Sequence, residues 1–222
     1  MAELCARRGV ALHVDATQAI GKVSVDLSRV PVDLLSLSAH KLNGPKGVGC
    51  LIARGGIALH PLLLGGPQER RRRGGTENVA GIAGLGVACE LAERELPERS
   101  SRYRALRDRL WEGLQTKISG IRRNGSALFV LPNSLNVEFE SAAGEVLLQA
   151  LDLEGVAVSS GAACASGTIE PSHVLLAMGC SPEAARGSLR MSVGYGVDEA
   201  QIDHVLAVLP DLVERARRAN AK

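Results

Sequence analysis

Apolar residues in the first half of the chain form short runs that are separated by turn residues. Three of these runs, at residues 10–14, 32–37 and 48–53, predict buried strands. Runs without polar alternation are typical of a mostly parallel sheet that is covered on both faces. Residues 62–75 form a loop rich in glycine and arginine. We therefore expect an α/β fold in this part of the chain.

The spacing of apolar residues changes to that of helices after this loop. Residues 79–96 predict a helix that Pro97 interrupts, and a second helix follows to about residue 117. Apolar residues at three- and four-residue spacing give the second helix a buried face, made by Tyr103, Leu106, Leu110 and Leu114.

The last third of the chain combines strands and helices. We expect a strand at 134–139, a helix at 144–153, a short strand at 156–159, alternation at Leu189, Met191 and Val193, and a closing helix from about Asp198. Asp198 and Gln201 resemble a capping box for that helix. Its buried stripe is expected to consist of Ile202, Val205, Leu206, Leu209 and Val213.

These patterns predict two domains with a boundary near Pro97. Residues 1–96 would form a sheet-rich α/β domain, and residues 97–222 a smaller α+β domain. Three strands are fewer than a doubly wound domain normally has. We therefore expect the chain to begin within a domain.

Composition limits the class of protein. Hydrophobic residues make up 45% and charged residues 23%, a balance typical of a soluble folded protein. The net charge of +2 and the 2% of aromatic residues argue against a nucleic-acid partner. No apolar run approaches the roughly 18 residues of a membrane span, and no secretory segment opens the chain. We therefore expect a cytoplasmic protein. The run Arg70–Arg73 is expected to be a solvated loop, and the alternative is a contact to nucleic acid.

The five cysteines do not predict a disulfide framework or a zinc site, because their number is odd and no two are separated by only two residues. Cys164 stands out because it lies in a stretch of small residues, SSGAACASG. Such a stretch cannot pack a core, so it predicts an exposed loop and an accessible, nucleophilic thiol. The alternative is an incidental surface cysteine.

A second group of residues follows two of the predicted strands. Ser38, His40 and Lys41 lie at the end of one strand, and Asp15 ends another. The carboxyl ends of parallel strands form a ligand crevice. A lysine, a carboxylate and phosphate donors in one crevice would suit pyridoxal phosphate (PLP). The alternatives are a solvated lysine and an aspartate that caps a turn.

Two further residues are candidates for binding anions. Thr76 precedes the predicted helix at residue 79, where backbone amides and a hydroxyl favour an anion or simply cap the helix. Arg190 lies on an alternating strand and could clamp a carboxylate through two hydrogen bonds, or form an ordinary surface ion pair.

Five segments together resemble a known family: HVDATQAIGK, LSLSAHKLNGPKGVG, GGPQERRRRGGTENV, SSGAACASG and SLRMSVG. They occur in the order found in cysteine desulfurases of the NifS/IscS type, which are class V aminotransferases of PLP-dependent fold type I, the aspartate aminotransferase-like fold. The resemblance implies that residues 1–96 are part of the large PLP-binding domain. Residues 97–222 would be the small domain that carries the catalytic cysteine loop.

The resemblance also implies roles for the residues that match the family's motifs. Lys41 would bind PLP covalently, Asp15 would pair with the pyridine nitrogen and Gln18 with the ring hydroxyl. Ser38 and His40 would bind the phosphate.

Three more roles follow from the same resemblance. Thr76 would reach the phosphate of the partner subunit in a homodimer, and Arg190 would hold the substrate carboxylate. Cys164 would carry the persulfide and, in relatives, can share a [2Fe-2S] cluster with a scaffold protein. The implied reaction removes sulfur from L-cysteine, giving L-alanine and a persulfide for iron–sulfur cluster assembly and sulfur transfer.

Two departures from the family affect these expectations. Relatives carry another large segment before these motifs, so we expect a truncated product, an internal start or half of a split protein, with little activity alone. Arg71 stands where the family usually has glycine. The alternatives are selenocysteine lyase, another class V enzyme, or an inactive remnant that only dimerises or binds a scaffold.

Overall fold

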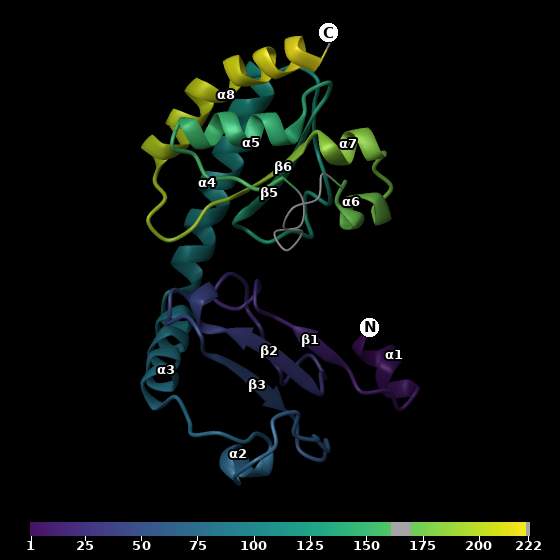
Figure 1. Cartoon of the computed structure of the whole chain (residues 1–222), viewed down its shortest axis with the longest axis vertical. Coiled ribbons are helices and arrows are strands. Elements are labelled where there is room, and N and C mark those ends of the chain that lie inside the picture. The colour runs from purple at the N-terminus through teal and green to yellow at the C-terminus, as the bar shows by residue number, and fades with distance from the viewer. Residues whose placement is uncertain (161–169, 221–222) are drawn as a thin grey trace. The chain divides into compact units, whose positions relative to one another are not determined.

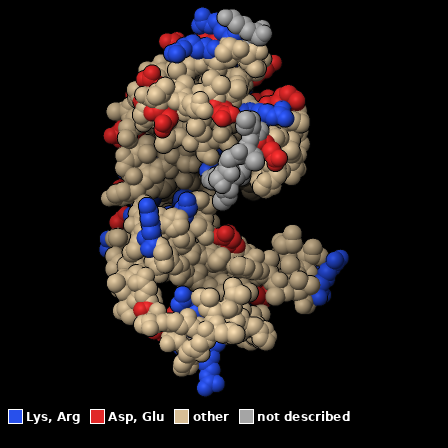
Figure 2. Space-filling view, viewed as in Figure 1, with Lys and Arg blue, Asp and Glu red and all other residues tan. Residues whose placement is uncertain are grey.

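The computed structural model describes residues 1–160 and 170–220 (Figure 1). The chain forms two compact units, which we call the N-terminal unit (Met1–Arg99) and the C-terminal unit (Ser100–Lys222). The boundary between them follows Pro97 closely. Figure 2 shows basic and acidic side chains interspersed on both units.

The N-terminal unit contains one three-stranded sheet, in the order β1-β2-β3, with helices around it. Its elements are α1 (Ala2–Arg7), β1 (His13–Asp15), β2 (Leu34–Ser38), the 3-10 helix η1 (Ala39–Leu42), β3 (Gly49–Ala53), α2 (Gln68–Arg71) and α3 (Val79–Arg94). Three strands were predicted within a few residues of these bounds, whereas α2 lies in what was predicted to be a loop.

The direction of β3 corrects the prediction of a mostly parallel sheet. Strands β1 and β2 run parallel, but β2 and β3 are antiparallel. A parallel connection needs a dozen or more residues, and the link from Ser38 to Gly49 is shorter than that. Strand β3 is also not buried in this structure, since Leu51 is 48% and Ile52 40% exposed.

Helix α3 packs on η1 and holds the loop after it. Leu85, Ala88 and Ala92 of α3 form a buried cluster with Ala39 and Leu42 of η1. The next loop lies equally close, because a Cβ at Gly84 of α3 would come within 2.6 Å of Pro45. Small residues on one face of α3 therefore let η1, which contains Lys41, sit directly on the helix.

The C-terminal unit is an antiparallel sheet, β4-β5-β6, packed against helices. Its elements are α4 (Leu96–Lys117, which starts in the N-terminal unit), β4 (Ile121–Arg123), β5 (Ser134–Phe139), α5 (Gly144–Leu153), α6 (His173–Ala177), α7 (Pro182–Arg186), β6 (Ser188–Ser192) and α8 (Glu199–Asn220). Helices α4, α5 and α8 lie together beside this sheet (Figure 1) and share its core.

Several sequence predictions are confirmed in this unit. Strand β5 and helix α5 have the predicted bounds, and the predicted faces of α4 and α8 are buried, with Val205 partly so. The capping box is reciprocal, because the Gln201 amide donates to Asp198 Oδ1 and the Asp198 amide donates to Gln201 Oε1, both at 3.0 Å.

The predicted strand at 156–159 is wrong, since only Ser159 forms a bridge. Within residues 1–160 and 170–220, no helix is long and apolar enough to cross a membrane.

Arg71 adopts a backbone conformation that favours glycine. Its φ is +65°, and φ is also positive at Glu69 and Arg70. The left-handed region costs a residue with a side chain about 1–2 kcal/mol. The glycine that the family usually has would avoid this cost.

We expect Arg71→Gly to raise the free energy of unfolding by up to about 1 kcal/mol and the melting temperature by about 2–4 °C. Thermal unfolding of the purified chain measures this. Arg72 is the matched control, because its φ of −95° is ordinary, so Arg72→Gly should give no gain. Equal melting temperatures for the two variants would contradict the account.

Candidate functional site

The carboxyl ends of β1 and β2 bring the first group of predicted residues to one edge of the sheet. Asp15 is the last residue of β1 and is in register with Ser36 of the parallel strand β2, which ends at Ser38. The Ala16 amide extends the pairing by donating to the Ser36 carbonyl at 2.9 Å. The chain therefore leaves both strands at the same edge, as predicted.

The local turn keeps the Asp15 side chain ionised. Asp15 Oδ1 accepts a hydrogen bond from the Thr17 amide at 2.9 Å. Hydrogen bonds from the Thr17 side chain and amide lower the pKa of Asp15 below its ordinary value, and nearby His13 adds to this effect. Asp15 is exposed, so its carboxylate is available to a cationic group of a ligand.

The η1 turn presents Ser38, His40 and Lys41. Ser38 Oγ lies 2.7 Å from His40 Nδ1. When the hydroxyl donates to Nδ1, the proton of the neutral ring is on Nε2, which then points a donor outward. Ala39 is fully buried, whereas His40 and Lys41 are exposed. The turn is thus anchored by its apolar residues and offers its polar ones to a ligand.

Sequence reasoning missed Lys22, which lies beneath this turn. Its side chain is buried, and its Nζ lies 3.5 Å from the Lys41 carbonyl oxygen. Burial lowers the pKa of Lys22, and the positive charge of Lys41 lowers it further. The segment after β1 has no periodicity that would have marked a lysine there as buried.

The donor set at this edge fits PLP. An ionised aspartate suits a protonated pyridine nitrogen, the Ser38–His40 pair offers donors for a phosphate, and Lys41 supplies an exposed amine. Gln18 is exposed three residues after Asp15 and offers an amide for a ring hydroxyl.

Thr76 is not the cap of α3, which removes one of the two alternatives for it. Asn78 is the N-cap, and its Oδ1 accepts from the Gly81 amide at 3.0 Å. Thr76 is exposed, and it follows a loop that is closed by a 2.7 Å hydrogen bond from the Gly74 amide to the Leu63 carbonyl.

Arg190 holds the first residue of the predicted cysteine loop. Its amide donates to the Ser159 carbonyl at 2.7 Å, and the Ser159 amide donates back at 3.1 Å. Arg190 is half-buried on β6, and in the described part of the chain it forms no ion pair. Cys164, predicted as the nucleophile and as a shared iron–sulfur ligand, lies outside the described residues.

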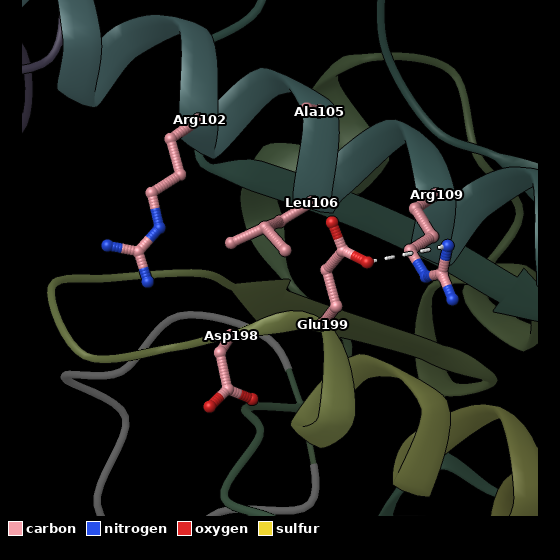
Figure 3. A pocket seen from close by; sticks show the side chains of 6 residues that line it. All are labelled: Arg102, Ala105, Leu106, Arg109, Asp198 and Glu199. Carbon is pink, nitrogen blue, oxygen red and sulfur yellow. Dashed lines mark ion pairs between the residues drawn. The ribbon is translucent and has the colours of Figure 1, made fainter.

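A hollow in the C-terminal unit contains none of the predicted site residues (Figure 3). It lies between α4 and the start of α8, where Arg109 pairs with Asp203 at 2.8 Å and with Glu199 at 3.9 Å. Arg102 donates to the Val197 carbonyl at 2.7 Å. Arg109 thus joins α4 to α8, and Arg102 joins α4 to the segment that precedes α8. No group of three or more metal-binding side chains occurs among residues 1–160 and 170–220.

Comparison with known proteins identifies the family. The class-V aminotransferase profile matches residues 1–205. A curated cysteine desulfurase of Gluconacetobacter diazotrophicus is 47% identical over 98% of this chain and 54% of the relative. The cysteine desulfurase IscS of Clostridium botulinum is 46% identical over 97% of this chain and 55% of the relative. The chain thus spans about half the length of the curated relatives it matches.

Solved structures agree with the sequence relatives. A NifS-like protein is 36% identical, with a TM-score of 0.84 over 94% of this chain and 53% of that one. The NifS-like protein of Rickettsia africae is 25% identical, with a TM-score of 0.87 over 96% of this chain and 56% of that one. These likenesses confirm the predicted fold class and the resemblance. The chain belongs to the class-V aminotransferase family.

Proposed function

We propose that this chain provides the lysine, the ring partner and the sulfur acceptor of a PLP-dependent cysteine desulfurase. One observation carries the proposal: the ionised Asp15 and the Ser38–His40–Lys41 turn leave two parallel strands at one edge of a sheet. The names of the relatives support the choice of reaction.

The N-terminal unit would hold the cofactor. Lys41 would bind it covalently, Asp15 would pair with its ring nitrogen, and Gln18 with its ring hydroxyl. The Ser38 hydroxyl and His40 would bind its phosphate. When bound, PLP supplies an electron sink for the carbon that bears the substrate amine.

Three side chains of this chain would then bind the substrate, remove its Cα proton and accept its sulfur. Arg190 would bind the carboxylate of L-cysteine through two hydrogen bonds. The Lys41 amine, freed when the substrate amine takes its place on the cofactor, would remove the proton from Cα. The Cys164 thiolate would attack the substrate sulfur, so that an S–S bond forms as the Cβ–S bond breaks. The electron pair of the broken bond stays with Cβ, which is protonated. L-cysteine and one thiol thus give L-alanine and one persulfide, and no oxidant is needed.

We further propose a homodimer in which Thr76 reaches the phosphate site of the partner subunit. Support comes from exposed apolar residues around Thr76, since Leu62 is 94%, Leu64 84% and Val79 72% exposed. The Gly74–Leu63 hydrogen bond keeps these leucines beside the segment that leads to Thr76. Apolar groups at this level of exposure are typical of an interface.

The sulfur would pass from Cys164 to an acceptor protein, such as an iron–sulfur scaffold with which Cys164 can share a [2Fe-2S] cluster. This role fits a cytoplasmic location. It follows from the resemblance and from the name IscS among the relatives.

The test is an assay of alanine release. Because the chain spans about half of its relatives, it should be assayed alone and together with the remaining segment of a curated relative, with PLP and L-cysteine. We expect the completed protein to form alanine and persulfide in equal amounts in the first turnover. Alanine formed from selenocysteine but not from cysteine would contradict the proposal and favour a lyase.

Asp15→Asn should lower alanine release by the completed protein by about 100-fold or more, because an amide cannot stabilise a protonated ring nitrogen. Asp26 is the matched control. It is exposed in the same kind of turn, accepts from the Ser28 amide at 2.8 Å, and has its pKa lowered by Ser28. Asp26→Asn should leave turnover within about twofold. Similar losses in both variants would show that the effect is one of folding.

A further inference from the structure

Lys22 is a buried cation that none of the proposed steps uses. It is 9% exposed, whereas most charged residues described in this chain are exposed. It lies in a tight turn with Gly21, whose φ is +74°. A Cβ at Gly21 would come within 3.1 Å of Leu42 and 3.3 Å of Ala92. The turn therefore packs closely on η1 and α3, which places the Lys22 side chain under η1.

The Lys22 ammonium has little compensation for its burial. It carries three donors, and in the described part of the chain its one hydrogen-bond acceptor is the Lys41 carbonyl oxygen, at 3.5 Å. None of the ion pairs between described residues involves Lys22. A buried charge without a counter-ion costs stability, as the lowered pKa of Lys22 also indicates.

The backbone explains why the Lys41 carbonyl needs a donor from elsewhere. The Gly44 amide, which could continue the turn, donates to the Ala39 carbonyl at 2.9 Å instead. The next residue, Pro45, has no amide hydrogen. Asn43 has already left the helix with a φ of +65°. Among the residues that the structure describes, the Lys22 ammonium is the group that reaches this carbonyl.

We propose that Lys22 is a positioning residue for Lys41. It holds the Lys41 carbonyl from beneath η1 and so fixes the direction in which the Lys41 side chain leaves the turn. The inference rests on the proposed function, since it gives Lys22 a role through the lysine that would bind PLP. It also explains why a lysine occupies a site where an apolar residue would be more stable.

The test compares Lys22→Met, Lys22→Arg and a control, Lys46→Met, which removes an exposed lysine four residues before Cys50. Each 222-residue chain is completed with the remaining segment of a curated relative, incubated with PLP and reduced with borohydride, and the labelled peptides are quantified by mass spectrometry. The readout is the share of label on Lys41 among all labelled lysines. Thermal unfolding of the same samples reports on folding.

We expect Lys22→Met to lower the share of label on Lys41 about tenfold, since small displacements of a reacting group are costly. Its melting temperature should stay the same or rise by about 2 °C or more, because a buried charge is removed. Lys22→Arg keeps a donor and a charge and should retain most of the labelling. If arginine proves too large to fold, Lys22→Gln, which keeps an N–H donor, takes its place. Lys46→Met should change neither quantity.

Three results would overturn the inference, and they can be told apart. Unchanged labelling in Lys22→Met would mean that Lys22 does not position Lys41. If both the share of label on Lys41 and the melting temperature fall in Lys22→Met, and neither is restored by arginine or glutamine, Lys22 only supports the fold. If Lys41 of the unsubstituted, completed protein is labelled no more than Lys46, the proposed function fails, and the role of Lys22 fails with it.

Discussion

Replacing Lys41 by alanine should abolish covalent attachment of PLP and lower alanine release from L-cysteine by about 1,000-fold or more. The effect is large because one amine would bind the cofactor and also remove the substrate Cα proton. Lys41 is exposed at the end of a turn anchored by Ala39 and Leu42, so its replacement should not disturb the fold. Mass spectrometry of the reduced protein and an alanine assay of the completed enzyme measure the two effects.

Lys46 provides the control for this substitution. It is exposed in the loop that follows η1, so Lys46→Ala removes the same charge from the same neighbourhood. We expect its turnover to stay within about twofold of the unsubstituted protein, as is usual for surface changes. Alanine release by Lys41→Ala at the rate of Lys46→Ala would contradict the assignment of Lys41.

The second large effect is expected for Cys164→Ala, which should abolish persulfide formation and leave PLP bound to Lys41. The thiol would be the one nucleophile that accepts the substrate sulfur, and alanine has no group to replace it. Incubation of the completed protein with L-cysteine, followed by mass spectrometry of the unreduced peptides, detects the persulfide. Absorbance of the cofactor reports independently on PLP binding.

Cys180 is the matched control for Cys164. It is half-buried in the C-terminal unit, and its Sγ lies 3.6 Å from Asn124 Oδ1. Cys180→Ala should therefore cost packing and one weak hydrogen bond, with persulfide still formed on Cys164. A persulfide that persists in Cys164→Ala and disappears in Cys180→Ala would show that Cys180 is the sulfur acceptor, and would contradict the assignment of Cys164.

Local patterns predicted the parts of the fold that local interactions determine. The bounds of β5 and α5 and the Asp198–Gln201 capping box follow from alternation, helical spacing and a cap within a few residues. The direction of β3 follows instead from the short connection between the runs at 32–37 and 48–53, a length that the sequence gives but that the apolar pattern of each run does not use. Strand β4 and the short helices α6 and α7 have too few residues for a period to be recognised.

The same distinction applies to the candidate site. The rule for parallel strands placed Asp15 and the Ser38–His40–Lys41 turn at one edge, and the structure has them there. Their hydrogen bonds depend on side-chain directions that the sequence does not specify, as in the Thr17 contact to Asp15. The burial of Lys22 depends on the close packing of Gly21 against Leu42 and Ala92, which is a tertiary effect. The role of Cys164 stays a prediction.

The central claim is that the carboxyl ends of β1 and β2 form a PLP site whose lysine is Lys41. The most direct measurement is to incubate the unsubstituted protein, completed with the remaining segment of a curated relative, with PLP. Borohydride reduction, digestion and mass spectrometry then identify the labelled lysine. The account predicts one label for each chain, on Lys41. A label on another lysine, or labels spread over many exposed lysines, would contradict it.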